Sequence, residues 1–237
     1  MSKMTIVSSG SKGNCIVIES NGEKLIVDLG VDENSILKSL NYKINDCVAA
    51  LCSHSHQDHS KSLDKFIKLG IPCYGNDDVC DKHVGCNKLP RLLKVGGFKI
   101  QTFELAHNVP NNAFIIDTSD GIRILYCTDT REIPFKVKNV NYAIIECNYD
   151  FEDLVDNMAS RETHDSQFDN HHNIDDCIDY LKTIYSEKLR GVILWHLSRG
   201  NINWQNALKK VKQKLFFDDV YLPFDDKVIS LQKDVFL

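Results

Sequence analysis

The sequence predicts an α/β sandwich in which two β-sheets lie inside and helices cover both outer faces. Three observations indicate this fold class. Short apolar runs that end in Gly, Asn or Asp fill the first half of the chain, and helical and extended patterns alternate further along. No repeat, low-complexity tract or proline-rich linker interrupts the 237 residues, so we expect one domain over residues 1–237.

Extended segments form most of the predicted elements. Asn21-Gly22, between the second and third strands, is typical of a tight hairpin turn. Apolar runs predict strands at residues 4–8, 15–19, 25–28, 48–52, 91–94, 98–105, 113–118, 122–127, 142–146, 192–196, 220–222 and 227–231.

Helices are predicted where apolar residues recur three and four positions apart. They cover residues 34–40, 60–69, 174–185 and 204–215, and Asp32 or Asn34 is the expected N-cap of the first. The polar stretch 157–173 predicts a long loop, and long loops often carry function.

Composition narrows the class of protein. The net charge of −5 argues against a protein that coats duplex DNA without specificity, because such proteins are usually basic. Nine cysteines without a C-x-x-C pair indicate a reducing compartment and no disulfide framework. The N-terminus lacks the apolar core of a signal peptide, and no apolar run reaches the roughly 18 residues of a membrane span. We therefore expect a cytoplasmic protein without membrane association.

A cluster of histidines and an aspartate follows the predicted strand at 48–52. His54, His56, Asp58 and His59 occupy four of six consecutive positions. Imidazole and carboxylate groups are ligands for zinc and also suit manganese, iron or nickel. The alternative, a solvated turn, explains poorly why four ligand-type side chains gather at the end of a strand. The stretch therefore predicts part of a metal site.

Three later side chains repeat the same design. His107, Asp129 and His196 each follow an apolar run that predicts a strand. A single histidine at a strand end is more often structural than a ligand. Together with the cluster at 54–59, however, they indicate a site to which several strands each deliver one ligand.

The stretch His54-Ser55-His56-Gln57-Asp58-His59 resembles the H-x-H-x-D-H signature of the metallo-β-lactamase fold hydrolases. Asp28 is similar to an early aspartate of that family, which supports the metal loop. His107, Asp129 and His196 follow in the order of the family's later ligands. The resemblance extends from Ile6 to about Leu231 and implies a four-layer αββα sandwich.

The resemblance also implies two divalent metal ions, zinc or alternatively manganese, which share a hydroxide that acts as the nucleophile. Asp58 is assigned a catalytic role as well as a ligand role. The implied ligands are His54, His56 and His107 on one ion, Asp58, His59 and His196 on the other, and Asp129 between them.

Residues 8–15, Ser-Ser-Gly-Ser-Lys-Gly-Asn-Cys, resemble a stretch of the YycJ/WalJ-like subfamily, and residues 146–149 and 196–198 match it further. That subfamily is related to RNase Z and includes DNA exonucleases. The resemblance implies a nucleotide or nucleic-acid substrate, with Ser11, Asn14 and Ser198 as contacts. A tight turn between strands is the alternative reading of residues 8–14.

Asn170-His171-His172-Asn173 aligns with a Gly-His-Leu-Ser-Asn segment of the same subfamily, and His171 falls on the motif histidine. A histidine there protonates the leaving oxygen or contacts the scissile phosphate. The segment departs from the pattern, so His172 is an alternative for this catalytic role. A polar loop that leads into a helix cap is the simpler alternative.

The leading functional hypothesis is a dinuclear phosphodiesterase that acts on a nucleic acid or nucleotide. One alternative is a phage-type 3′,5′-cyclic nucleotide phosphodiesterase that degrades defence signals. Another is a thioester or lactone hydrolase, since this fold also supports that chemistry. A metal-holding scaffold without activity is disfavoured because all seven ligands are present. A homodimer is expected if the loop at 157–173 reaches a neighbour's site.

Overall fold

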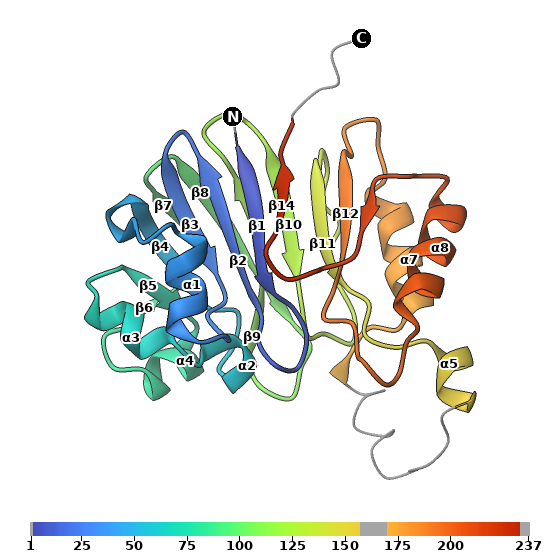
Figure 1. The fold of residues 1–237 in the computed structure, drawn as a ribbon, viewed down its shortest axis with the longest axis horizontal. Helices are drawn as coiled ribbons and strands as arrows, with labels where there is room; N and C mark the ends of the chain where they lie inside the picture. Colours follow the sequence, from blue (N-terminus) through green and yellow to red (C-terminus); the bar gives the residue numbers. More distant parts are fainter. Residues whose placement is uncertain (1, 157–169, 233–237) are drawn as a thin grey trace.

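The computed structural model describes residues 2–156 and 170–232 and shows two sheets packed face to face between layers of helices (Figure 1). In the described residues each sheet has seven strands. The first sheet has the order β14 (Lys227–Ser230), β1 (Lys3–Ser8), β2 (Cys15–Ser20), β3 (Glu23–Val27), β4 (Cys47–Leu51), β5 (Cys73–Gly75), β6 (Asn87–Lys88). The second has the order β13 (Val220–Tyr221), β12 (Gly191–Trp195), β11 (Tyr142–Glu146), β10 (Arg123–Cys127), β9 (Asn111–Asp117), β8 (Phe98–Leu105), β7 (Leu92–Val95).

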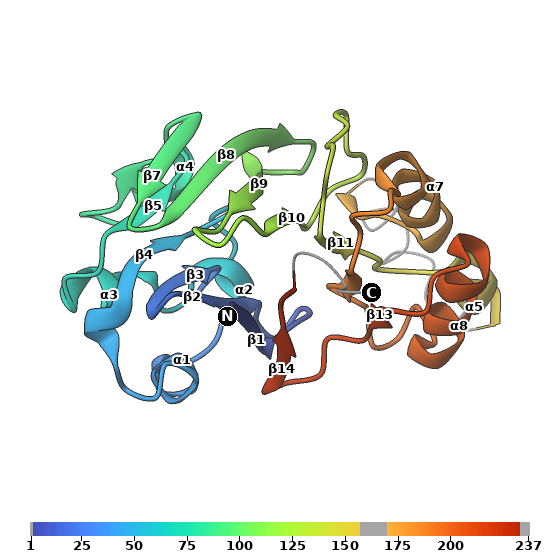
Figure 2. The same ribbon diagram turned by 90° about the horizontal axis from the view of Figure 1, so that it is seen from above.

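The view from above shows α1 and α3 on one side of the molecule and α7 and α8 on the other (Figure 2). Between β3 and β6 of the first sheet the chain forms α1 (Glu33–Ser39), the 3-10 turn η1 (Ile44–Asp46), α2 (Gln57–Ser60), α3 (Leu63–Lys68) and α4 (Asp77–Lys82), and buried residues of α1, α3 and α4 pack on the outer face of that sheet. On the side of the second sheet are α5 (Phe151–Asp156), α7 (Ile174–Ile184) and α8 (Trp204–Leu215). This arrangement confirms the predicted four-layer αββα sandwich.

Side chains that alternate between the two faces of each strand explain the four layers. In β3, Leu25 and Val27 face the second sheet, whereas Ile26 faces α1 and α3. In β10, Tyr126 faces the first sheet and Leu125 packs against the helices of the other side. Because successive side chains of a strand point to opposite faces, strands that are apolar at every position need cover on both sides. The core therefore divides into one inter-sheet layer and two sheet–helix layers.

Parallel pairing brings the ends of several strands to one edge. β3 pairs with β4 in parallel, and so do β10 with β11 and β11 with β12. The segment that follows β4 carries α2, which lies at the bottom of Figure 1. Loops that follow parallel strands leave the sheet at their carboxyl ends, where ligands bind in open α/β sheets. The candidate site lies at this edge.

Some predicted elements differ from the observed ones. The helix predicted at 60–69 corresponds to α3, which begins later, at Leu63, and ends at Lys68. The separate helix α2 precedes it, and between the two the Ser62 hydroxyl donates to the carbonyl of Val31. Helix α4 was not predicted, since six residues are too few to show a helical period, although Asn76 caps it through the Val79 amide at 3.1 Å. Asp32 is the N-cap of α1.

Two further predictions concern the chain as a whole. Most of the loop predicted at 157–173 lies outside the described residues, which resume at Asn170. None of the helices in residues 2–156 and 170–232 has both the length and the hydropathy that a bilayer crossing needs. The cytoplasmic location stays a prediction, and so does the assignment of residues 1–237 to one hydrolase domain.

Candidate active site

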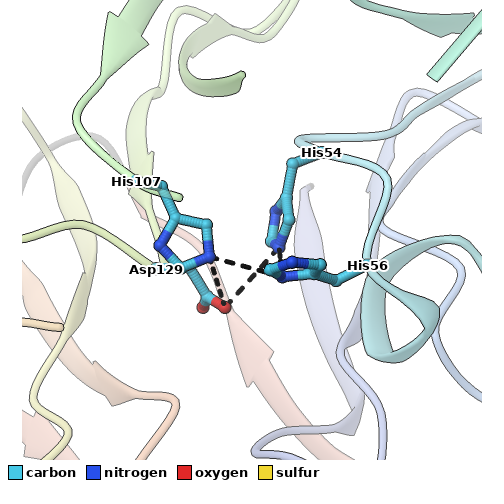
Figure 3. A group of neighbouring side chains, drawn as sticks. All are labelled: His54, His56, His107 and Asp129. Atoms are coloured by element: carbon cyan, nitrogen blue, oxygen red, sulfur yellow. Dashed lines mark hydrogen bonds and ion pairs between the residues drawn. The ribbon is translucent and has the colours of Figure 1, made fainter. Parts of the chain in front are cut away.

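Four of the predicted ligands converge on one point between the two sheets (Figure 3). His54 and His56 follow β4 of the first sheet, whereas His107 and Asp129 follow β8 and β10 of the second. Their potential ligand atoms all lie within 4.8 Å of one another. Nε2 of His54 lies 3.0 Å from Nδ1 of His56 and 3.6 Å from Oδ2 of Asp129. Such a set of nitrogen and oxygen donors suits a first-row divalent cation.

The other three predicted ligands form a second group around the same aspartate. Asp58, His59 and His196 join Asp129 with their ligand atoms again within 4.8 Å. Oδ2 of Asp58 lies 3.5 Å from Nε2 of His59 and 3.4 Å from Nε2 of His196. Because Asp129 is common to both groups, the seven side chains form two adjacent donor sets. A third combination of ligand-type side chains within the same distance joins Glu146 and His171 to Asp129 and His196.

Three of the site residues have left-handed backbone conformations within two residues of a strand end. The φ angles are 57° at Asp28, 49° at Asp129 and 52° at His196. For a residue with a Cβ this conformation costs about 1–2 kcal/mol, and it persists only where surrounding contacts impose it. The sharp turn ends each strand at the site. We interpret the strain as the consequence of placing these side chains at the cluster.

Asp28 lies beneath the metal loop and orients it. The side chain is fully buried, and its Oδ2 accepts from the Tyr126 hydroxyl at 2.6 Å and lies 2.7 Å from Nδ1 of His59. Its Oδ1 accepts from the Ser53 amide at 2.8 Å. A carboxylate on Nδ1 fixes the imidazole so that Nε2 faces the cluster. Asp28 therefore supports the site as the sequence predicted, although it is not itself in either donor set.

Electrostatics keep the shared aspartate ionised. Burial opposes ionisation of Asp129, but His196 and His59 hold the pKa of its carboxyl well below its ordinary value. Burial by itself would lower the pKa of His59, yet Asp129 and Asp28 outweigh it and raise that pKa well above its ordinary value. A buried carboxylate among imidazoles is the charge pattern that a cation stabilises further.

Asn14 does not take the place that the sequence predicted for it. It is fully buried, and its Nδ2 lies 2.9 Å from Nε2 of His59 and donates to the carbonyl of Asp58 at 3.3 Å. Its Oδ1 accepts from the Gly10 amide at 2.9 Å. The side chain thus ties the 8–14 turn to the metal loop instead of lining the cavity over the cluster. Its identity was visible in the sequence, but its orientation depends on tertiary contacts.

Of the other two predicted substrate contacts, one lines the cavity over the donor groups and one does not. Ser11 is exposed and lines a cavity of about 260 Å³ that also contains Asp58, His107 and His196. Ser198 does not line this cavity. Its amide donates to the carbonyl of Asn148 at 3.0 Å, and its carbonyl accepts from the Trp204 indole at 3.1 Å.

The structure also distinguishes His171 from His172. His171 lines the cavity, and its ring stacks on that of His196 with centroids 5.4 Å apart. Its Nδ1 lies 2.6 Å from Oε1 of Glu146. His172 is buried outside this cavity, and its backbone amide donates to the other carboxylate oxygen of Glu146 at 3.3 Å. His171 is thus the histidine of this pair that faces the donor groups.

Glu146 is a site residue to which sequence reasoning assigned no role. It is fully buried, accepts from the Thr130 amide at 2.7 Å and lies 3.3 Å from Nδ1 of His196. Burial by itself would lower the pKa of His171, but the Glu146 carboxylate raises it above its ordinary value. The available signal was its position at the end of the strand 142–146, the same position from which the other site residues come.

Comparisons with known proteins concern the fold and the class of protein. The profile of the Metallo-beta-lactamase superfamily matches residues 9–76. Exodeoxyribonuclease WalJ of Streptococcus pneumoniae is 25% identical over 258 aligned residues, which cover 98% of this chain and 95% of that protein. Exodeoxyribonuclease YycJ of Bacillus anthracis is 25% identical over 169 residues, 63% of this chain and 64% of that protein.

Solved structures share the fold at lower identity. YhfI of Bacillus subtilis, described as a metallo-beta-lactamase fold protein, superimposes with a TM-score of 0.73 at 19% identity and covers 97% of this chain and 100% of its own. The short form of human tRNase Z superimposes with a TM-score of 0.69 at 16% identity, covering 98% of this chain and 100% of its own.

Fold, donor groups and relatives together define a metal-dependent hydrolase with the metallo-β-lactamase fold. Within that class, the chain resembles exodeoxyribonuclease WalJ over nearly its whole length and exodeoxyribonuclease YycJ over 63% of it.

Proposed function

We propose that this protein is a dinuclear phosphodiesterase that hydrolyses a phosphodiester of a nucleic acid or nucleotide. The observation that carries the proposal is the pair of donor groups that share Asp129, with His171 on the wall of the same cavity. Both predicted donor sets, one of His54, His56 and His107 and the other of Asp58, His59 and His196, remain our assignment of the two cation positions.

The donor set fits divalent cations. Five imidazoles and two carboxylates match the ligand preferences of zinc, and manganese accepts the same groups. When bound, two such cations would activate a water molecule and neutralise the negative charge that develops on the phosphate. Asp129 serves both positions, and Asp58 and His196 approach each other closely enough to hold one cation together.

His171 has the geometry of the proton donor. Glu146 holds its Nδ1, and the side chain lines the cavity, so Nε2 is the ring nitrogen that this proposal assigns to the substrate. Hydrolysis breaks the bond between phosphorus and the leaving oxygen, and that oxygen needs a proton when it departs as an alcohol. His171 supplies it in this proposal, and Glu146 is a positioning residue. Ser11, at the exposed rim, contacts a phosphate oxygen.

The relatives favour a nucleic-acid substrate. Two curated relatives are exodeoxyribonucleases, and a structural neighbour is a tRNase. This supports a nuclease before the alternatives, namely a 3′,5′-cyclic nucleotide phosphodiesterase and a thioester or lactone hydrolase. The homodimer stays a prediction.

A parallel substrate assay tests the proposal. The protein is loaded with Zn²⁺ or Mn²⁺ and assayed against bis-p-nitrophenyl phosphate, single- and double-stranded DNA, 3′,5′-cyclic nucleotides and a thioester. We expect hydrolysis of bis-p-nitrophenyl phosphate and of DNA, and loss of both in His56→Ala. Turnover of cyclic nucleotides without DNA degradation would favour the first alternative. A His56→Ala variant with full activity would reject the site.

A further inference from the structure

A separate cavity lies on the outer face of the second sheet. It has a volume of about 260 Å³ and is lined by Arg91, Leu92, Lys99, Gln101, Thr102 and Phe103. Leu93 and Ile100 pack between the two sheets, so the residues next to them on β7 and β8 face outward. Figure 2 shows β7 and β8 at the end of the sheet away from α7 and α8. None of the six lining residues belongs to the donor groups.

Two cations of this cavity carry uncompensated charge. Arg91 and Lys99 are exposed, and neither forms an ion pair with any residue in the described ranges 2–156 and 170–232. The carbonyl of Arg91 accepts from the Thr102 amide at 3.1 Å, which anchors this residue beside β8. Asp117 is opposite Lys99 on β9, but its carboxylate accepts from Nε of Arg123 at 2.7 Å and from Nη2 at 2.9 Å. The cavity therefore offers two positive charges without a carboxylate at ion-pair distance.

A third cation lies beside them. The register of β7 and β8 places Lys94 directly opposite Lys99, and Lys94 is also exposed and without an ion pair among the described residues. Like charges that are directly opposite on neighbouring strands destabilise a sheet. The fold therefore gains no stability from this pair, whereas a bound anion would remove the repulsion. Anion binding explains the group of cations better than a structural role does.

The lining groups match a phosphate. A guanidinium presents paired N–H donors that fit phosphate oxygens, and an ammonium adds a point charge. The Gln101 amide supplies a further donor. Leu92, which is 49% exposed, and the partly buried Phe103 give the same cavity an apolar surface for a sugar. The volume is below the roughly 300–1,000 Å³ of most small-molecule sites, so it suits one phosphate with its sugar.

Strand β8 leads from this cavity to the candidate active site. Lys99 is near the start of the strand, Leu105 is at its end, and His107 of the first donor group follows. At about 3.3 Å per residue, Lys99 and Leu105 are roughly 20 Å apart. About six nucleotides stacked at roughly 3.4 Å each cover that distance, and a stretched strand needs fewer. A dinucleotide held at the donor groups is therefore too short to reach the cavity.

We infer that Arg91 and Lys99 bind a phosphate of a single-stranded nucleic acid, several nucleotides away from the scissile bond. Lys94 adds to the local attraction. The inference rests on the proposed function, because the distance is counted from a phosphodiester at the donor groups. It narrows the substrate to a strand that is long enough to reach the cavity. A local group of cations also lets a protein with a net charge of −5 hold a polyanion.

Kinetics with substrates of two lengths test this. The metal-loaded variant Arg91→Ala/Lys99→Ala is assayed with thymidylyl-thymidine and with a single-stranded thymidine oligomer of about twelve nucleotides. We expect kcat/KM for the oligomer to fall about tenfold relative to kcat/KM for thymidylyl-thymidine. The slope of log KM against log salt concentration for the oligomer falls by about 0.7 for each phosphate contact that is lost. Arg91→Lys/Lys99→Arg keeps both charges and restores most of the loss.

The matched control is Lys43→Ala/Lys68→Ala. It removes two exposed lysines outside the cavity and changes the net charge by the same amount. The ratio of kcat/KM between the two substrates and the salt dependence stay at their wild-type values, because the effect depends on the place of the charges.

Binding gives a result that is independent of turnover. Fluorescence anisotropy follows a labelled oligomer of the same length whose phosphorothioate links resist hydrolysis. We expect Arg91→Ala/Lys99→Ala to weaken its binding about tenfold, and an equal concentration of inorganic phosphate not to displace it from the wild-type protein.

Three outcomes decide between the possibilities. Unchanged oligomer affinity and an unchanged ratio of kcat/KM in Arg91→Ala/Lys99→Ala would overturn the strand site and leave the phosphodiesterase intact. Inorganic phosphate that binds the wild-type protein but not this variant, with oligomer affinity unchanged, would assign the cavity to a small anion and also overturn it. Oligomer binding that depends on Arg91 and Lys99, without hydrolysis of any diester, would instead reject the proposed function and support the strand site.

Discussion

Oε1 of Glu146 lies 2.6 Å from Nδ1 of His171, and the same carboxylate reaches back to His196 of the donor groups. A fully buried glutamate thus connects the histidine that faces the cavity with a side chain of the second donor group. The contact orients the imidazole of His171. It also gives a direct way to separate proton donation from metal binding.

Glu146→Gln keeps the shape of the side chain and removes its charge. We expect kcat for thymidylyl-thymidine to fall about a hundredfold, which is typical for the loss of a general acid. Hydrolysis of bis-p-nitrophenyl phosphate falls much less, because its leaving group departs as a stable anion. The double variant Glu146→Gln/His171→Ala is no slower than His171→Ala, since the two residues act as one unit. Equal losses on both substrates would argue that Glu146 acts only through the metal ligands.

Asp28→Ala removes the buried acceptor of three different partners. We expect the free energy of unfolding to fall by about 3–5 kcal/mol, because the buried donors of Ser53, His59 and Tyr126 lose a charged partner. Metal affinity falls about 10- to 100-fold, as for other supports of metal-binding histidines. Tyr126→Phe is the matched control and costs only about 1–3 kcal/mol, since it removes one of these contacts. Chemical denaturation and metal titration measure both effects, and equal costs for the two variants would contradict this role.

The donor groups predict different metal losses for different ligands. Asp129→Ala removes the aspartate that both groups share, so we expect fewer than one tightly bound ion per chain. His107→Ala removes a side chain of only one group, and one ion remains. His83→Ala is a suitable control because His83 pairs with Asp64 and belongs to neither group. Mass spectrometry measures the ion content, and two ions retained in Asp129→Ala would contradict the shared role.

Gly30 allows two segments to approach closely beneath the site. A Cβ atom at this position would lie 1.6 Å from the carbonyl oxygen of Asp58. We therefore expect Gly30→Ala to displace the metal loop and to lower both metal affinity and activity at least tenfold. Gly200→Ala is the control, since nothing lies within 4 Å of a Cβ added there. Normal metal affinity in Gly30→Ala would show that the loop adapts without consequence for the site.

The sequence was sufficient to predict candidate site residues that lie in a recognisable local pattern. The candidate ligands at 54–59 lie within one short signature, and His107, Asp129 and His196 each follow an apolar strand. Strand positions were predictable for the same reason, because apolar runs in both sheets are buried on two faces.

Other features depend on contacts between distant segments. Asn14 and His59 are 45 residues apart, and only the fold shows that they touch. His171 and His172 are adjacent, so the sequence could not decide which of them faces the cavity. The charge of Glu146 was visible, but its burial against His171 was not, because glutamate side chains are mostly exposed unless they are paired.

Metal titration of the metal-free protein, followed by calorimetry and by hydrolysis of bis-p-nitrophenyl phosphate, tests the dinuclear phosphodiesterase most directly. With two donor groups that share Asp129, we predict two binding events per chain and a rate that rises mainly with the second equivalent of Zn²⁺. A rate that is complete after one equivalent, or a fully loaded protein that hydrolyses no phosphodiester, would contradict the proposed function.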